Sequence, residues 1–352
     1  MAVQIPAILF YVPNWLGDAV MATPALRAAR ATWPDHKLLL IGTPAACGVL
    51  HGLPHYDETM IIPPGASFSD MIRIARNIRK RYWVDTALIL PHSFRAALLA
   101  RMSGAIRRVG LDRNGRRWLL TEPVVPKRDG NRIIPEYMVF EYLRLVEAAG
   151  GQADGAGPGL SISERARQRV SEVLPPDTGP VVALAPGAAF GPSKRWYPER
   201  FAATADQLAH TCGATCVLLT GPGEESIREA VRQAVRVPLV EIRDGGIELL
   251  KAVIARADLL ITNDSGPRHI AVALGTTVVC VMGPTSEDYT ESPWEKGELI
   301  RAAVPCAPCQ QPVCPLEHHA CMREITVDMV VNTARKWLTG RAEKSRLSGD
   351  KT

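Results

Sequence analysis

The stretch DLLITNDSGPRHIAVALG, residues 258–275, combines a predicted buried strand, a tight turn and an apolar helix, the local unit of an α/β fold. The strand is predicted to end at Asn263 and Asp264, and Ser265 and Gly266 form the turn. Pro267 stands in the first helical turn, a position that tolerates its missing N–H. Free N–H groups at such a helix start, with the helix dipole behind them, favour an anion such as a diphosphate.

The side chains of this stretch allow two interpretations. Ser265 can add a hydroxyl donor to an anion site, and His269 lies one turn into the same helix. Alternatively, Asp264 or Ser265 is an N-cap and His269 is a hydrogen-bonded core histidine.

Outward from this stretch, short aliphatic runs alternate with helical patterns in both halves of the chain, which indicates βαβ units and parallel sheets. A glycine-rich segment without periodicity, GGQADGAGPG (150–159), is the best linker candidate. We therefore predict an α/β protein with two Rossmann-like, doubly wound parallel-sheet domains facing a central cleft. The predicted parts are an N-terminal domain (1–160), a C-terminal domain (161–340) and a flexible tail (341–352). Ligands of such sheets bind at the carboxyl ends of the strands.

The composition limits the classes of function. The 352 residues are 47% hydrophobic and 22% charged, as in globular proteins, and a net charge of +5 is too small to argue for nucleic acid. No apolar run reaches the roughly 18 residues of a membrane span. The first apolar run, AILFYV, has no basic segment before it and is too short for a signal peptide, so we expect a cytoplasmic protein.

A second motif, ALAPGAAFGPSKRWYPERFA (183–202), leads from a strand through a loop of small residues to Lys194. Small residues permit close backbone approach to a ligand, and the lysine can neutralise phosphate charge. The spacing is not that of a P-loop, and no GxGxxG follows the first strand. A solvated Lys194–Arg195 pair is the alternative.

A third motif, TGPGEESIREA (220–230), ends another strand with glycines followed by acids. A carboxylate here, first of all that of Glu224, can hydrogen-bond ribose hydroxyls. It can equally complement the dipole at the start of the next helix.

Near the N-terminus, PNWLGDAVMATPAL (13–26) places Asp18 just inside a helix predicted over residues 18–31. The carboxylate can stabilise the helix start, or it can take a proton from a substrate hydroxyl. Asp18 is the only acid in the first strand-to-helix turn, so we interpret it as a general base.

Four of the eight cysteines crowd into PCAPCQQPVCPLEHHACM (305–322), namely Cys306, Cys309, Cys314 and Cys321. The C-x2-C spacing is compatible with a structural metal, although the overall spacing is irregular for a zinc ribbon. Packed reduced thiols and a disulfide are the other interpretations. The remaining cysteines lie in or near apolar runs and read as core residues.

Positive charge is densest in IRRVGLDRNGRRWLL (106–120), which can hold carboxylates and phosphates of a substrate or touch anionic lipid, or is simply a solvated loop. RIARNIRKRYW (73–83) has the pattern of an amphipathic surface helix, and proximity to a membrane is its alternative role.

Together PGAAFGPSKRW, NDSGPRHIA and the N-terminal LGDAVMATPAL resemble motifs of the ADP-heptose:lipopolysaccharide heptosyltransferases, glycosyltransferase family nine. The resemblance covers about residues 8 to 335 and implies a GT-B fold, with acceptor bound by the first domain and nucleotide-sugar by the second. It implies inversion at the anomeric carbon, no metal and no cofactor. PGAAFGPSKRW with CPLEHHAC is most similar to the branch that adds the second inner-core heptose.

The resemblance also implies residue roles. The catalytic residues would be Asp18 as base and Lys194 on the diphosphate. The implied donor-binding residues are Lys194, Glu224, Asp264, Ser265, Gly266 and His269, with Trp196 lining the site. Arg95 and Arg113 would contact the anionic acceptor.

The implied function is transfer of L-glycero-D-manno-heptose from ADP-heptose to the first heptose of the lipopolysaccharide inner core. The expected partners are this donor, that acceptor and, peripherally, the cytoplasmic face of the inner membrane, with no nucleic acid. The alternatives are addition of the first heptose, another GT-B sugar transfer, a GT-B-fold sugar-nucleotide epimerase and a metal-bearing binding module.

Overall fold

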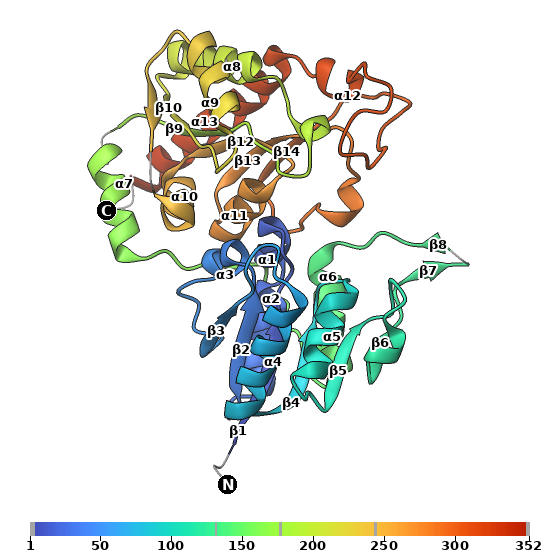
Figure 1. Ribbon diagram of the computed structural model, residues 1–352. Helices are drawn as coiled ribbons and strands as arrows, with labels where there is room; N and C mark the ends of the chain where they lie inside the picture. The colour runs from blue at the N-terminus through green and yellow to red at the C-terminus, as the bar shows by residue number, and fades with distance from the viewer. Residues whose placement is uncertain (1–3, 131, 176–177, 243–244, 350–352) are drawn as a thin grey trace. The chain divides into compact units, whose positions relative to one another are not determined.

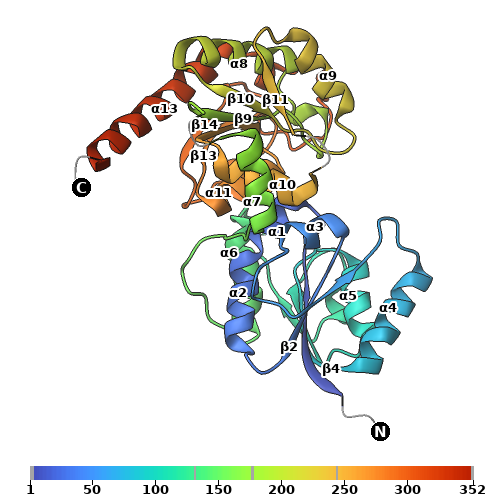
Figure 2. The same cartoon turned by 90° about the vertical axis from the view of Figure 1, so that its left-hand side faces the viewer.

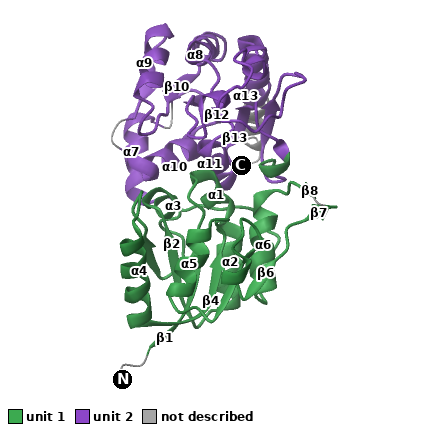
Figure 3. Cartoon of the chain, turned by 45° about the vertical axis from the view of Figure 1, so that its right-hand side comes forward, with its two compact units in different colours: residues 1–161, 288–291 green, residues 162–287, 292–352 purple. Residues whose placement is uncertain are grey.

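The computed structural model describes residues 4–130, 132–175, 178–242 and 245–349 and contains two compact units (Figure 3). Unit 1 comprises Met1–Ser161 and Asp288–Glu291, and unit 2 comprises Ile162–Glu287 and Ser292–Thr352. The division lies beside the predicted boundary at residue 160, with one short segment of the second half added to unit 1.

Unit 1 is built on a six-stranded parallel sheet in the order β3-β2-β1-β4-β5-β6 (Figure 1). Its strands are β1 (Ile5–Tyr11), β2 (Lys37–Gly42), β3 (Glu58–Ile61), β4 (Tyr82–Ile89), β5 (Arg107–Leu111) and β6 (Glu122–Val124). Its helices are α1 (Leu16–Met21), α2 (Thr23–Thr32), α3 (Pro44–Val49), α4 (Phe68–Arg81), α5 (Phe94–Met102) and α6 (Met138–Ala148). A 3₁₀ turn, η1 (Arg117–Leu119), and a small antiparallel pair, β7 (Arg128–Asp129) and β8 (Arg132–Ile133), complete it.

Helices cover both faces of this sheet: α2 and α6 lie on one side, and α4 and α5 on the other (Figure 2). The strands are therefore apolar on both faces, which is why they read as continuous aliphatic runs rather than alternating ones.

Unit 2 repeats the same strand order, β11-β10-β9-β12-β13-β14, again all parallel. Its strands are β9 (Val181–Ala185), β10 (Thr215–Leu218), β11 (Leu239–Glu241), β12 (Leu259–Asn263), β13 (Thr277–Val281) and β14 (Gly297–Ile300). Its helices are α7 (Glu164–Val173), α8 (Pro198–Cys212), α9 (Glu225–Ala234), α10 (Gly246–Arg256), α11 (Gly266–Leu274), α12 (Ala320–Arg323) and α13 (Val327–Gly349). Two 3₁₀ turns are η2 (Pro192–Lys194) and η3 (Glu287–Tyr289). Helices α8, α9 and α13 cover one face, and α10 and α11 the other (Figure 2).

This order confirms the prediction of two Rossmann-like, doubly wound sheets. In each unit the order reverses beside the first strand, between β1 and β4 and between β9 and β12. Ligands of doubly wound sheets bind at this switch point, outside the carboxyl ends of the strands.

The single helix predicted over residues 18–31 was wrong, because the structure ends α1 at Met21 and starts α2 at Thr23, with Pro24 in the first turn where it needs no helical N–H partner. The flexible tail over 341–352 stays a prediction: α13 extends to Gly349, and residues 350–352 lie outside the described residues.

Candidate functional site

In unit 2 the start of α11 forms a potential anion site at the carboxyl end of β12. Ser265 is the N-cap in extended conformation, and Gly266 and Pro267 open the helix. The Ser265 hydroxyl makes no capping bond and is a buried group without a hydrogen-bond partner among the described residues. An unpartnered hydroxyl beside the free N–H groups of a helix start is suited to an anionic ligand.

Lys194, which ends η2, lies at this helix start. Its Nζ donates to Asp264 Oδ2 at 2.7 Å and to the Asp264 carbonyl oxygen at 3.0 Å. Its side chain is 13% exposed, and the ammonium lies 5.1 Å from the centre of the Phe190 ring. An ammonium carries three donors, so one N–H remains beyond these two bonds for a ligand.

Asp264 is shared by a second cation. Arg268, one turn along α11, donates from Nη1 to Asp264 Oδ1 at 2.9 Å and from Nη2 to Glu295 Oε2 at 2.7 Å. The Thr285 hydroxyl donates to Asp264 Oδ2 at 2.8 Å. Asp264 and Arg268 are only 2% and 0% exposed, so their charges are stable in the interior because each is paired.

These pairings set the protonation states at the site. Burial raises the pKa of Asp264, but the charges of Lys194 and Arg268 outweigh it and hold that pKa well below its usual range. Burial, with Arg268 adding to it, lowers the pKa of His269 to about 3. Asp264 is therefore ionised and His269 neutral at neutral pH.

Asn263, the last residue of β12, holds both ends of the loop between β9 and α8. Its Nδ2 donates to the Pro186 carbonyl oxygen at 2.7 Å, and its Oδ1 accepts from the Trp196 backbone N–H at 3.0 Å. Trp196 itself is fully buried and donates its indole N–H to the Ile325 carbonyl oxygen at 3.0 Å. The expectation that Trp196 lines the site was wrong, because its ring belongs to the core beneath the loop.

Glu224 bridges the loops that follow β9 and β10. Its Oε2 accepts from the Gly221 N–H at 2.7 Å, and its Oε1 lies against Gly187. A Cβ on Gly187 would lie 1.9 Å from that oxygen, so only glycine allows the approach. The carboxylate is thus held at the carboxyl edge of the sheet, next to the loop that Asn263 fixes.

In unit 1, Asp18 is a half-buried residue in the first turn of α1, just after β1. It lies near Tyr142 of α6: burial, with the negative charges of Asp18 and Glu141 adding to it, raises the pKa of Tyr142 well above its ordinary value. Because α1 begins at Leu16, Asp18 lies inside the helix rather than before it, as the sequence indicated.

The two arginines expected to meet an acceptor follow neighbouring strands of the same sheet. Arg95 lies in the first turn of α5, after β4, and donates from Nη2 to the Ala66 carbonyl oxygen. Arg113 follows Asp112 in the loop after β5. Asp18, Arg95 and Arg113 thus follow three adjacent strands, β1, β4 and β5.

The sequence reasoning missed a histidine–carboxylate pair at this edge. His92, after β4, places Nε2 2.6 Å from Oε1 of Glu141, which is buried in α6. Asn114 donates to the His92 carbonyl oxygen at 2.9 Å. The signal available in the sequence was PHS directly after a predicted strand, but nothing in it pointed to Glu141.

Arg116 lies in the basic segment 106–120, which the sequence did not predict to be buried. It is fully buried and donates from Nε to the Leu111 carbonyl oxygen at 3.0 Å and from Nη1 to the Pro91 and Ser93 carbonyl oxygens. This guanidinium therefore holds the loops after β4 and β5 together rather than contributing to a solvated patch.

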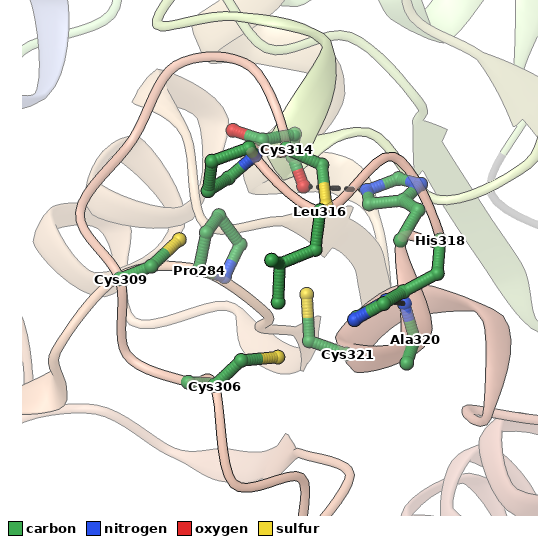
Figure 4. A pocket seen from close by; sticks show the side chains of 12 residues that line it. Pro284, Cys306, Cys309, Cys314, Leu316, His318, Ala320 and Cys321 are labelled. Carbon is green, nitrogen blue, oxygen red and sulfur yellow. Dashed lines mark hydrogen bonds between the residues drawn. The ribbon is translucent and has the colours of Figure 1, made fainter.

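The four clustered cysteines surround a cavity of about 20 Å³, room for one water molecule (Figure 4). All four are free thiols, and burial, with the neighbouring thiols adding to it, raises the pKa of Cys321 to about 11. Among the described residues, no three His, Cys, Asp or Glu side chains are arranged to hold a metal ion.

Comparison with known proteins fits this architecture. A family model described as glycosyltransferase family 9 (heptosyltransferase) matches residues 71–320. The chain therefore belongs to glycosyltransferase family 9 and is a glycosyltransferase.

Particular relatives match along almost their whole length. The chain is 25% identical to lipooligosaccharide heptosyltransferase 2 of Campylobacter jejuni, covering 94% of this chain and 99% of the relative. It is 29% identical to lipopolysaccharide heptosyltransferase 2 of Salmonella typhimurium, covering 84% and 87%. The solved structure of Escherichia coli ADP-heptose lps heptosyltransferase II matches with a TM-score of 0.78 and 25% identity, covering 96% and 99%. The fold is thus the GT-B type that the motifs implied.

No helix of the described residues is long and apolar enough to span a bilayer.

Proposed function

We propose that this glycosyltransferase moves L-glycero-D-manno-heptose from ADP-heptose to the first heptose of the lipopolysaccharide inner core. The names of the similar proteins, heptosyltransferase 2 of lipopolysaccharide and lipooligosaccharide, support the sugar and the acceptor. The ADP-heptose in the name of the similar E. coli structure supports the donor.

The observation that carries the proposal is the position of the Lys194 ammonium at the start of α11. A diphosphate leaving group gains negative charge as the bond to the sugar breaks, and fixed donors aimed at it stabilise the transition state. Lys194, the Ser265 hydroxyl and the Gly266 N–H are such donors, and the proposal needs no metal ion.

The remaining donor contacts follow from the neighbouring loops. Glu224, fixed by Gly221 and set against Gly187, accepts hydrogen bonds from the ribose hydroxyls. Asp264 holds Lys194 in place, and His269, a buried residue of α11, is neutral and adds no charge to the site.

Unit 1 supplies the acceptor side. Asp18 takes the proton of the acceptor hydroxyl while its oxygen attacks the anomeric carbon, and the bond from that carbon to the diphosphate oxygen breaks with its electron pair leaving on ADP. One displacement inverts the anomeric centre. Arg95 and Arg113 bind anionic groups of the acceptor. Binding this acceptor would bring the enzyme peripherally to the cytoplasmic face of the inner membrane.

The test is mass spectrometry of inner-core lipopolysaccharide incubated with ADP-heptose, protein and a chelator. Two acceptors are compared, one ending in the first heptose and one lacking it. The proposal expects one added heptose on the former and none on the latter. Addition only to the core without heptose would assign the first transfer instead, and donor conversion without acceptor would indicate an epimerase.

A further inference from the structure

The cysteine-rich segment has no part in the proposed function. It is attached to the loop that carries Lys194. We call residues 305–319 the cysteine loop. This loop is bonded to Ser193, the residue before Lys194.

Ser193 makes a hydrogen bond to this loop with each of its three polar groups. Its N–H donates to the Pro312 carbonyl oxygen at 3.1 Å, and its hydroxyl donates to the Gln311 carbonyl oxygen at 2.6 Å. Its carbonyl oxygen accepts from His319 Nε2 at 2.8 Å, which fixes the tautomer of that imidazole. Ser193 is 2% exposed, so water does not compete for these bonds.

Gly191 brings the two loops into contact. It has a φ of +156°, and a Cβ there would lie 2.2 Å from the Pro312 carbonyl oxygen. Any side chain at this position would push the Lys194 loop off the cysteine loop.

The cysteine loop also reaches the other partner of the Lys194–Asp264 ion pair. The Gln310 N–H donates to the Pro284 carbonyl oxygen at 2.8 Å, and the next residue, Thr285, donates to Asp264 Oδ2. The thiol-lined cavity lies between these two attachments, with Ser193 and Pro284 both in its wall (Figure 4). The cysteine loop therefore contacts Ser193, the neighbour of Lys194. It also contacts Pro284, the neighbour of Thr285, whose hydroxyl donates to Asp264.

We propose that the cysteine loop is a positioning element for the donor diphosphate, in which His319 sets the place of the Lys194 ammonium by holding Ser193. The inference rests on the proposed function, because it takes the diphosphate as the ligand of Lys194. His319 is a positioning residue and touches no substrate in this account.

The test is a double-mutant cycle on ADP binding, measured by titration calorimetry with the full-length chain. His319→Ala is expected to weaken ADP binding about tenfold, the loss of a buried hydrogen bond expressed in affinity. In the Lys194→Ala background the same change is expected to have no further effect, because there is no ammonium left to misplace.

Matched variants separate positioning from general damage. His318→Ala removes the adjacent imidazole, whose Nδ1 accepts from the Ala320 N–H within the segment, and should leave ADP binding unchanged. His319→Gln keeps a donor for the Ser193 carbonyl oxygen and should restore part of the affinity. Should His319→Ala fail to fold, Ser193→Ala removes one of the three bonds and enters the same cycle.

The outcomes are distinct. Wild-type protein that binds ADP but transfers no heptose overturns the proposed function. An effect of His319→Ala that persists at full size in the Lys194→Ala background, or equal ADP affinity of His319→Ala and wild type, overturns the positioning role.

Discussion

Lys194 and Asp264 lie seventy residues apart in the sequence, yet Nζ of the lysine is 2.7 Å from Oδ2 of the aspartate. The pair joins the loop after β9 to the start of α11, on the two strands that flank the switch point of unit 2. Two motifs that were separate in the sequence thereby become one site.

The buried ion network predicts a large stability effect at Asp264. Asp264→Asn leaves the positive charges of Lys194 and Arg268 without their shared carboxylate, which should cost about 3–5 kcal/mol of unfolding free energy. Thr285→Val removes only one hydrogen bond to the same carboxylate and should cost about 0.5–1.5 kcal/mol. Urea unfolding of both variants checks this, and equal losses would contradict the account of the network.

Asp18 should act on the chemical step alone. Asp18→Asn keeps the shape but removes the base, so kcat should fall by about 10²–10⁴-fold. The KM for ADP-heptose should stay within about twofold, since uniform donor binding is untouched. Asp112→Asn, which changes an acid paired with Arg117 after β5, serves as the control in steady-state assays. Turnover of Asp18→Asn near that of wild type would remove Asp18 from the mechanism.

His269 predicts a pH dependence of stability. Its pKa is about 3 in the folded chain against an ordinary 6.5, so below pH 6.5 the unfolded chain binds a proton that the folded chain excludes. Stability conferred by the neutral imidazole is complete above pH 6.5 and is lost as the pH falls toward 3, by about 1.4 kcal/mol per pH unit.

The check is the unfolding free energy of the full-length chain at pH 6.5 and pH 5.5, for wild type and His269→Gln. The wild-type protein should lose about 1 kcal/mol more than the variant over this interval, because the unfolded imidazole is already half protonated at pH 6.5. Identical losses would show that His269 is not buried as a neutral group.

The cysteines are predicted to be eight thiols, as all eight are free in the structure. Thiol titration in denaturant without reductant should give eight groups per chain, and a chelator should leave the unfolding midpoint of the native protein unchanged. Fewer thiols would indicate a disulfide, and a midpoint lowered by the chelator would indicate a metal in the cluster.

The sequence predicted the doubly wound sheets because buried parallel strands read as continuous aliphatic runs, such as VVALA before the Lys194 loop. It also predicted the helix start at Ser265-Gly266-Pro267, since the turn and cap residues there are local signals. Both features are determined by residues that are close together in the sequence.

The sequence did not predict the contacts between segments that are distant in the chain. The burial of Trp196 and Arg116, the pairing of His92 with Glu141 and the attachment of the cysteine loop to Ser193 all join segments distant in the chain. A tryptophan or arginine in a polar stretch reads as a surface residue until the partner that satisfies its N–H groups is known.

Calorimetric titration of ADP into wild-type and Lys194→Ala protein tests whether the start of α11 and Lys194 bind the donor diphosphate. Lys336→Ala, which removes an exposed lysine of the same unit, is the control. We predict one ADP per wild-type and Lys336→Ala chain, and about 10- to 100-fold weaker binding to Lys194→Ala, the loss of a charged hydrogen bond. Equal affinity of Lys194→Ala and wild type would contradict the account.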